Sequence, residues 1–266
     1  MALIGTLTSG VSALRTFSKG LEVIGNNIAN VNTTAFKSSN ANFSDSFSNT
    51  LRSATTSAGD SAVQIGTGVQ LSSISTNFTQ GQLSSTGVPT DLGISGAGYF
   101  VVQNGTLNYA TRSGAFTFDS SGNLINEQGY NVLGSDGNPI VAANYANASS
   151  VSIGSDGTVS IFYADGTPTD SSQKVGLLKI PEESKLMKQG NNLYDFASTG
   201  AVIGDLTTPG AGGLGTVKSG VLELSNVDLT DQFSNLITTQ RSFQAGSRLV
   251  TVSDSVLEDV VNLKRN

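Results

Sequence analysis

The only abundant side chains of this sequence that could act as a catalytic acid or base are carboxylates. The sequence holds 20 Asp and Glu but no His and no Cys, so imidazole bases, thiol nucleophiles, disulfides and thiolate zinc sites are excluded. Most of the Asp occupy turn positions, where an Asx turn explains them without chemistry: Asp119, Asp136, Asp156 and Asp165. We therefore expect no catalytic residues and no enzyme activity.

Two short motifs could in principle bind a metal or a cofactor. Asp119–Asn123 resembles the opening of a calcium loop, but no acidic ligand follows at loop position 12. Gly93–Gly98 is glycine-rich, but it precedes a predicted strand instead of opening a helix, so it does not fit a dinucleotide site. We expect no cofactor and no metal.

The composition argues against several kinds of partner and location. The 266 residues carry a net charge of −6 with only 14 Lys and Arg, which argues against a nucleic-acid partner. No apolar run approaches the ~20 residues of a membrane span. The opening residues lack a basic region followed by an apolar core, so no cleaved signal peptide is expected.

Both ends of the chain predict long amphipathic helices, over about 3–32 and 229–263. In each of them apolar residues recur every seven positions, which is typical of a coiled-coil-like seam. The seam residues are Leu7, Leu14, Leu21, Ile28, Leu229, Leu236, Phe243, Val250 and Leu257.

Helix length suggests what these seams face. At 1.5 Å per residue the helices are roughly 45 and 50 Å long. A body of ~150 residues is only some 30–40 Å across. The seams must therefore face each other, other copies of the chain, or both, and a simple intramolecular helical hairpin is the alternative.

The middle of the chain predicts antiparallel β-structure. Asn104-Gly105 between Tyr99–Gln103 and Thr106–Tyr109 is a strong hairpin signal. Further strands are expected at Ala115–Phe118, Asn123–Asn126, Val151–Ile153, Val159–Tyr163 and Val175–Ile180. This spacing indicates a sandwich or a partly closed barrel, and an α+β fold overall.

Three parts follow from these patterns. Residues 1–35 and 225–266 form a discontinuous helical core domain, and 76–224 form a β-rich outer domain. Residues 36–75 are expected to be an extended linker, with a short helix suggested by Phe43, Phe47 and Leu51. The five glycines within 209–220 predict a flexible approach to the last helix.

Four ordered stretches resemble the flagellar axial proteins of the rod and hook. The first is Leu21–Lys37, which reads LEVIGNNIANVNTTAFK, and the second runs from Thr79 to Phe100. The third comprises Tyr109, Arg112, Gly114 and Phe116, and the fourth runs from Gly220 to Asp228. The match extends in order over nearly the whole chain.

The resemblance implies a non-enzymatic structural subunit of the bacterial flagellar hook or basal body. It implies terminal helices in the core of a helical tube, a β-rich domain outside it, and transmission of torque from motor to filament. The implied partners are copies of the same chain, neighbouring axial proteins (rod, hook cap or junction proteins) and the flagellar type III export apparatus. Export would proceed without a cleaved signal.

The resemblance also suggests functional residues. The seam residues are the expected assembly interface, and the family motif residues are Asn26, Asn27, Asn30, Phe36, Lys37, Ser225 and Asn226. The asparagines at positions 26, 27, 30 and 32 either cap the helix and form a turn, or bind a neighbouring subunit.

The sequence favours the hook over the rod. The ending Val256–Arg265 and the opening Ile4–Leu14 look more like a hook protein. The length is nearer that of a rod protein, so a distal or proximal rod subunit is the alternative. A secreted adhesive or carbohydrate-binding β domain is a remote third possibility, which the absence of Trp disfavours.

Overall fold

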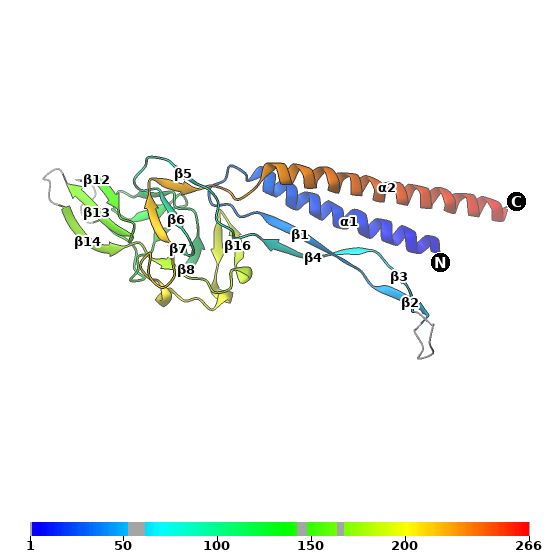
Figure 1. Cartoon of the computed structure of the whole chain (residues 1–266), viewed down its shortest axis with the longest axis horizontal. Helices are drawn as coiled ribbons and strands as arrows, with labels where there is room; N and C mark the ends of the chain where they lie inside the picture. Colours follow the sequence, from blue (N-terminus) through cyan, green and yellow to red (C-terminus); the bar gives the residue numbers. More distant parts are fainter. Residues whose placement is uncertain (1, 53–61, 143–147, 164–167, 266) are drawn as a thin grey trace. The chain divides into compact units, whose positions relative to one another are not determined.

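The computed structural model describes residues 2–52, 62–142, 148–163 and 168–265 (Figure 1). The chain divides into two compact units. The helical unit comprises Met1–Val31, Ser38–Asn77 and Val227–Asn266, and the β unit comprises Asn32–Lys37 and Phe78–Asn226. Each unit is therefore built from segments that are far apart in the sequence.

Two long helices dominate the helical unit, α1 (Ala2–Ala29) and α2 (Leu229–Arg265). This confirms the predicted terminal helices. They run antiparallel and side by side (Figure 1), since Thr6 lies next to Ser253 and Asn27 next to Gln232. The start of α2 is capped as its sequence suggests, because the Asp228 carboxylate accepts a hydrogen bond from the backbone N–H of Thr230 at 2.8 Å.

Strands complete the helical unit. β1 (Ser39–Asp45) pairs with β4 (Val69–Thr76), and β2 (Ser48–Arg52) pairs with β3 (Val63–Gly66), both antiparallel. The expected short helix over Phe43, Phe47 and Leu51 is wrong. The Ser, Thr and Asn residues around these apolar residues are weak helix formers, and pairing with a distant strand satisfies their backbone groups instead.

The β unit contains the remaining strands. They are β5 (Leu83–Ser85), β6 (Leu92–Ser95), β7 (Tyr99–Asn104), β8 (Leu107–Thr111), β9 (Phe116–Phe118), β10 (Leu124–Asn126), β11 (Asn131–Val132), β12 (Ala148–Ile153), β13 (Thr158–Tyr163), β14 (Pro168–Lys174), β15 (Leu177–Leu178), β16 (Met187–Gly190), β17 (Leu193–Asp195), β18 (Thr216–Ser219) and β19 (Val221–Glu223). Short 3-10 turns lie at Glu183–Lys185, Ala197–Thr199 and Ile203–Asp205.

These strands confirm the predicted antiparallel β-rich centre. The largest sheet has the order β16-β17-β8-β7-β11-β10-β9, with β15 also paired to β7. A second sheet has the order β12-β13-β14, and two pairs, β18 with β6 and β19 with β5, complete the set. The expected flexible segment 209–220 is in part wrong, because its last residues form β18 against β6.

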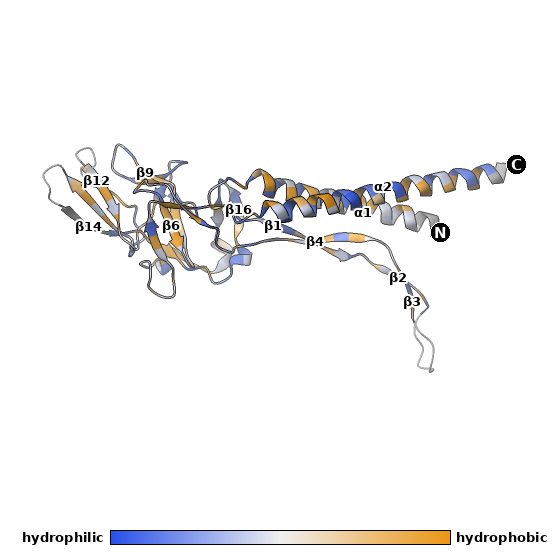
Figure 2. Cartoon of the chain, turned by 45° about the horizontal axis from the view of Figure 1, so that its top comes forward, coloured by the Kyte–Doolittle hydropathy of each residue, from blue (hydrophilic) through white to orange (hydrophobic). Residues whose placement is uncertain are grey.

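The core of the β unit lies on both faces of β7. Phe100 and Val102 belong to one buried cluster, and Tyr99 and Val101 belong to the other. This explains the uninterrupted apolar run at the start of β7, since a strand covered on both faces needs no polar alternation. Figure 2 shows the corresponding hydrophobic colour in the central strands.

Two tight turns in the β unit depend on left-handed residues. The predicted β7–β8 hairpin is present and turns at Gly105, whose φ is +61°. The β16–β17 hairpin turns at Asn191 and Asn192, with φ of +51° and +57°. Asn is one of the few side chains that tolerates this conformation, and two consecutive positive φ values are typical of a type I′ turn.

Candidate functional site

The family motif residues fall into two groups. Asn26, Asn27 and Asn30 lie at the end of α1 in the helical unit, whereas Phe36, Lys37, Ser225 and Asn226 lie in the β unit. The motif residues therefore form two separate sites, one in each unit.

Asn27 joins three segments of the helical unit. Its amide nitrogen donates to the Ser39 carbonyl at 2.8 Å and to Gln232 Oε1 at 3.0 Å. Its Oδ1 accepts a hydrogen bond from the Ser39 backbone N–H at 3.0 Å. The side chain is buried, and it ties the end of α1 to the start of β1 and the start of α2. Asn27 thus has a structural role inside one copy of the chain.

Asn30 caps α1 in the same unit. Its side-chain nitrogen donates to the Asn26 carbonyl at 2.9 Å, which satisfies a carbonyl at the helix end. Of these asparagines Asn30 makes a capping contact, whereas the side chain of Asn27 bonds to β1 and α2 instead of capping α1. Asn26 and Asn32 are exposed.

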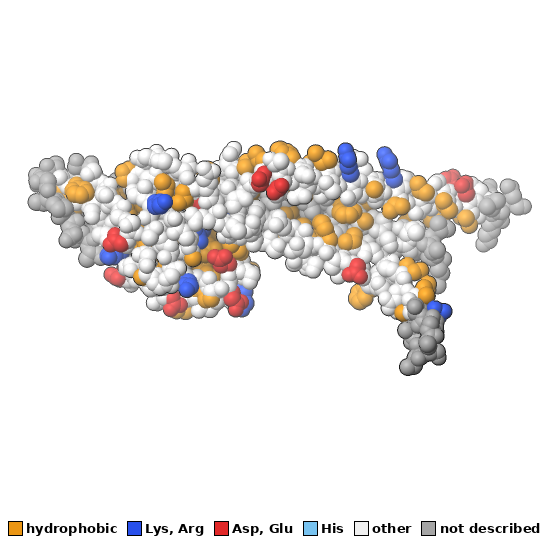
Figure 3. Space-filling view, viewed as in Figure 1, with side chains coloured by type: hydrophobic (Ala, Val, Ile, Leu, Met, Phe, Trp, Pro, Cys, Tyr) orange, Lys and Arg blue, Asp and Glu red, His pale blue; other side chains and the backbone are white. Residues whose placement is uncertain are grey.

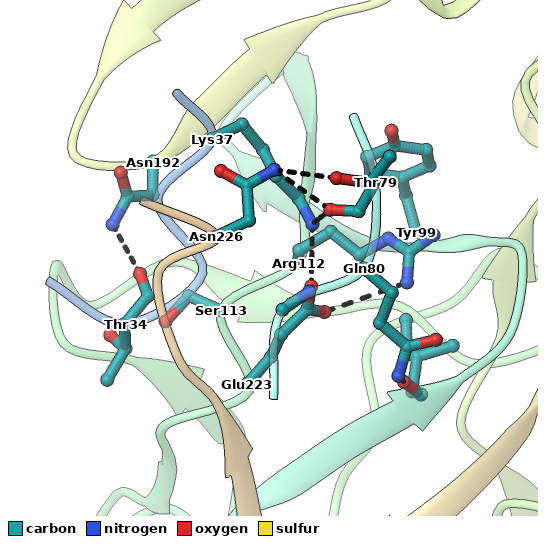
Figure 4. Close-up of polar contacts among 12 residues, drawn as sticks. Thr34, Lys37, Thr79, Gln80, Tyr99, Arg112, Ser113, Asn192, Glu223 and Asn226 are labelled. Carbon is teal, nitrogen blue, oxygen red and sulfur yellow. Dashed lines mark hydrogen bonds and ion pairs between the residues drawn. The ribbon is translucent and has the colours of Figure 1, made fainter. Parts of the chain in front are cut away.

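A buried ion cluster organises the β unit (Figure 4). Lys37 Nζ donates to Glu223 Oε1 at 2.6 Å and to the Thr79 carbonyl at 2.8 Å. The same carboxylate oxygen accepts the backbone N–H of Gly81 at 2.9 Å. Both charged side chains have no exposed surface. A buried charge is stable only when paired and hydrogen-bonded, so three remote segments must meet here together.

Arg112 is the second cation of the cluster. Its guanidinium lies 3.7 Å from Glu223 Oε2, donates to the Gly96 carbonyl at 2.9 Å, and stacks 4.8 Å above the Tyr99 ring. The Tyr99 hydroxyl in turn donates to Glu183 at 3.0 Å. Lys37 and Arg112 therefore share the single buried carboxylate of Glu223. Glu183 is linked to Arg112 only indirectly, through the ring and hydroxyl of Tyr99.

Backbone contacts hold the segment 32–37 in the same place. The N–H of Ala35 donates to the Glu223 carbonyl at 2.8 Å, and the Asn226 side chain donates to the Thr79 carbonyl at 3.0 Å. Asn192, from the β16–β17 turn, donates to the Thr34 carbonyl at 2.7 Å. Ala35 is buried and has a φ of +57°, a conformation that a residue with a Cβ adopts only under constraint.

Gly81 explains why a glycine occupies the second motif stretch. A Cβ at this position would collide with the Leu224 carbonyl oxygen. The backbone before β5 therefore packs directly against the backbone of Leu224, which only a residue without a side chain allows. The same close approach brings the Gly81 N–H to Glu223.

Burial shifts the pKa of the titratable groups around the cluster. It lowers the pKa of the Lys37 ammonium, against the opposing hydrogen bond and charge of Glu223. Burial also lowers the pKa of Lys188, whose ammonium donates to the Lys37 carbonyl at 2.9 Å. Burial, reinforced by Glu183, raises the pKa of Tyr99. Lys37 and Tyr99 are thus held away from water, whereas Lys188 belongs to the exposed strand β16.

Two of the predicted seam residues, Leu14 and Val250, lie at the contact between α1 and α2. Gly10 faces Val250, with 2.9 Å between a Cβ built on the glycine and Val250 Cγ2, and Gly246 packs next to Leu14. Of the predicted set only Leu229 is exposed, with 39% of its full accessible surface. The remainder are half-buried: Leu7, Leu14, Leu21, Ile28, Leu236, Phe243, Val250 and Leu257.

A different apolar surface of α2 is exposed. Figure 3 shows hydrophobic side chains along this helix, on the face in view. The exposed residues include Phe233, Ile237, Leu249, Val252, Val256, Val260 and Val261, at 39–63% of their full accessible surface. Exposed apolar surface of this extent along one helix is typical of an interaction site.

Sequence reasoning missed several important residues. Glu223 and Arg112 were within the matched stretches, but nothing in their local sequence marks them as a buried ion cluster. One available signal was the low charged fraction, 13%, which makes charged residues beside apolar strands noteworthy. Gln232 and Ser39, the partners of Asn27, carry no sequence signal at all.

The described residues contain no group of three or more acidic side chains that could hold a metal ion. Within the same residues no helix is long and apolar enough to cross a membrane.

Known proteins match this chain over nearly its whole length. Three family profiles match in order: flagella basal body rod protein over residues 7–37, flagellar hook protein FlgE/F/G D1 domain over 93–161, and flagellar basal body rod FlgEFG protein C-terminal over 218–263.

The relatives are named as rod and hook proteins. The flagellar basal-body rod protein FlgG of Bacillus subtilis is 42% identical over 99% of this chain and 100% of its own length. FlgG of Borreliella burgdorferi is 31% identical over 100% and 99%. The flagellar hook protein FlgE of Treponema pallidum is 42% identical, but over 47% of this chain and 28% of its own length.

Proposed function

Because the chain belongs to the flagellar hook and basal-body rod protein family, we propose that it is a structural subunit of the rod, in its distal section. It is a protein of the flagellar hook–basal body, and its relatives are structural proteins and not enzymes. The terminal residues favour the hook, but the comparisons support the rod alternative better.

Length coverage is the observation that carries the rod assignment. The relatives named as rod proteins align with the chain from end to end, whereas the relative named as a hook protein aligns over less than half of it. End-to-end alignment with the rod relatives supports the rod assignment, whereas the alignment with the hook relative covers only 28% of that protein. Most of the C-terminal residues that suggested a hook fall within a profile named for FlgE, FlgF and FlgG together, so they do not separate hook from rod.

The helical unit provides the assembly surface. The exposed apolar residues of α2 are proposed to pack against neighbouring copies, together with the seam residues along the helical pair, in a coiled-coil-like core. Removing this surface from water contributes roughly 25 cal/mol per Å². Contacts between unlike surfaces, related by a rotation that does not close, build a helical tube.

The β unit is suited to carrying load. Its segments 32–37, 79–81 and 223–226 are fastened by the buried ion cluster and by backbone hydrogen bonds. Force applied to the chain where it enters or leaves this unit acts on buried, mutually supporting contacts. Such a closed unit is what a subunit that transmits torque requires.

Export through the flagellar type III apparatus is part of the proposal. A chain without Cys forms no disulfide that would resist unfolding. Four glycines in α1 each cost the helix roughly 1 kcal/mol relative to Ala, so an isolated α1 is weak until it packs.

The decisive experiment deletes the gene and locates the protein. Cells without the chain should form basal bodies that lack the distal rod, hook and filament, and the unmodified gene should restore motility. A Leu236→Asp variant should be exported and keep a folded β unit but fail to assemble. Cryo-microscopy of intact basal bodies should place the chain in the straight rod, and density in the curved hook would overturn the proposal.

A further inference from the structure

One exposed stripe on α2 has the geometry of a docking surface. Ala245, Leu249, Val252, Val256 and Val260 recur at intervals of three and four, so they share one face of the helix. Leu249 and Val252 are 58% and 59% exposed. We call these five residues the α2 stripe.

A groove of matching character lies elsewhere in the same helical unit. It is an open depression of about 660 Å³ between α1 and β4. Its apolar lining comes from Leu7, Val11, Val69 and Leu71, and Arg15 and Lys19 also line it. We call it the α1–β4 groove.

One copy of the chain cannot fill its own groove with its own stripe. The helices α1 and α2 already contact each other along Gly10, Thr6 and Gly246. The stripe and the groove both lie outside that contact, because the stripe is exposed and the groove opens on the β4 side of α1. The occupant of the groove must therefore come from another molecule.

The charged residues beside the groove and the stripe indicate which part of a second molecule fits the groove. Lys19 is engaged by Glu22 at 2.8 Å, whereas Arg15 has no ion pair among the residues described. Asp259 lies three positions after Val256 and seven after Val252, at the edge of the stripe, and it too has no ion pair within the described part of the chain. At the other end the stripe is bordered by Arg241 and Arg248. The positive charge of Arg15 in the groove is therefore complementary to the acidic, C-terminal end of the stripe, and not to the basic end.

We propose that the α1–β4 groove receives the C-terminal part of the α2 stripe of a second copy, with Arg15 facing Asp259. The inference rests on the proposed self-assembly and specifies one of its contacts. Because groove and stripe are different surfaces, each copy offers one of each. The contact is therefore heterologous and propagates from copy to copy.

Charge reversal in the full-length chain tests the pairing. Arg15→Glu and Asp259→Arg should each raise the protein concentration needed for polymerisation by about tenfold, which corresponds to about 1.4 kcal/mol. The double variant Arg15→Glu/Asp259→Arg should return to within about threefold of the unmodified chain. Lys218→Glu, an exposed reversal in β18, is the matched control and should change little.

Site-directed cross-linking gives an independent measurement, since the chain has no Cys of its own. A mixture of Val11→Cys and Val256→Cys chains should form a disulfide-linked dimer on polymerisation. A mixture of Val11→Cys with Ile237→Cys, an exposed position off the stripe, should not.

The outcomes separate this inference from the function on which it rests. Single reversals that polymerise normally, a double variant no better than the worse single variant, or equal cross-linking at positions 237 and 256 would each overturn the docking. In all three cases polymerisation of the unmodified chain would leave the proposed function standing. An unmodified chain that remains monomeric at every concentration would overturn both.

Discussion

Lys37 and Glu223 lie 186 positions apart in the sequence, yet their charged atoms are 2.6 Å apart and their side chains are completely buried. The contact brings the end of the N-terminal motif to the last strand before α2. It is supported by the Gly81 N–H and the Thr79 carbonyl, so each charge has further hydrogen bonds.

The first prediction concerns this pair. Glu223→Gln should lower the free energy of unfolding more than Lys37→Met does, because two cations share the one carboxylate and both lose it. Each loss should be about 3–5 kcal/mol, as expected when one partner of a buried pair is removed. Urea unfolding of the full chain, followed by the near-ultraviolet circular dichroism of the tyrosines, measures it.

The matched control for this prediction is Lys218→Met, which removes an exposed lysine from β18. It should change the unfolding free energy by less than about 0.5 kcal/mol. If Lys37→Met behaved like the control, the cluster would not hold the β unit together.

The second prediction concerns Asn27. Asn27→Asp replaces a donor by a carboxylate that faces two acceptors, the Ser39 carbonyl and Gln232 Oε1. The helical unit should lose about 2–3 kcal/mol of stability, seen as earlier thermal loss of the helix signal at 222 nm. Asn26→Asp introduces the same charge at an exposed neighbour and should cost only a few tenths of a kcal/mol.

The third prediction concerns the left-handed conformation of Ala35. Ala35→Gly relieves the backbone strain but removes a buried methyl, so the two effects should cancel to within about 0.5 kcal/mol. Ala201→Gly is the comparison, because Ala201 is also buried but has no positive φ. It should cost about 1 kcal/mol, and equal losses at both positions would contradict the strain at Ala35.

The fourth prediction is a pH dependence at Asp156. Its pKa is lowered to about 2, first by the hydrogen bond from the Thr158 hydroxyl at 2.7 Å and then by Lys174. A lowered folded-state pKa stabilises the protein above about pH 4, and this contribution disappears as the pH falls toward 2.

The effect at Asp156 should be small, below about 1 kcal/mol, because its side chain is 56% exposed and screened by water. Asp156→Asn should remove it and flatten that part of the stability profile between pH 4 and 2. Asp136→Asn, at another exposed turn, is the control. Titration of the Asp156 carboxyl by NMR checks the pKa directly.

The sequence predicted what depends on local pattern. The heptad spacing predicted both helices, and Asn104-Gly105 predicted the β7–β8 hairpin, because periodicity and turn chemistry are properties of neighbouring residues. A sandwich or barrel arrangement of the sheets and a coiled-coil seam remain predictions.

What the sequence could not supply depends on remote pairing. The strands β1 and β4 consist largely of polar residues and exist because they pair with each other across the intervening hairpin. The assembly role of the heptad residues stays a prediction. The exposed stripe of α2 is a different set, which the sequence did not single out because the position of α1 decides which side of α2 is covered. The partners of Asn27 and Lys37 are likewise known only once the chain has folded.

The buried pocket around Lys37 has a consequence for incomplete molecules. Ribosomes release the N-terminal motif early, but the carboxylate that neutralises its lysine belongs to one of the last segments synthesised. A prematurely terminated product would leave an ammonium group in an apolar surrounding and an unpaired β5. The cluster can therefore form only in a chain that has been synthesised past Glu223, and we expect shorter products to be digested readily by proteases.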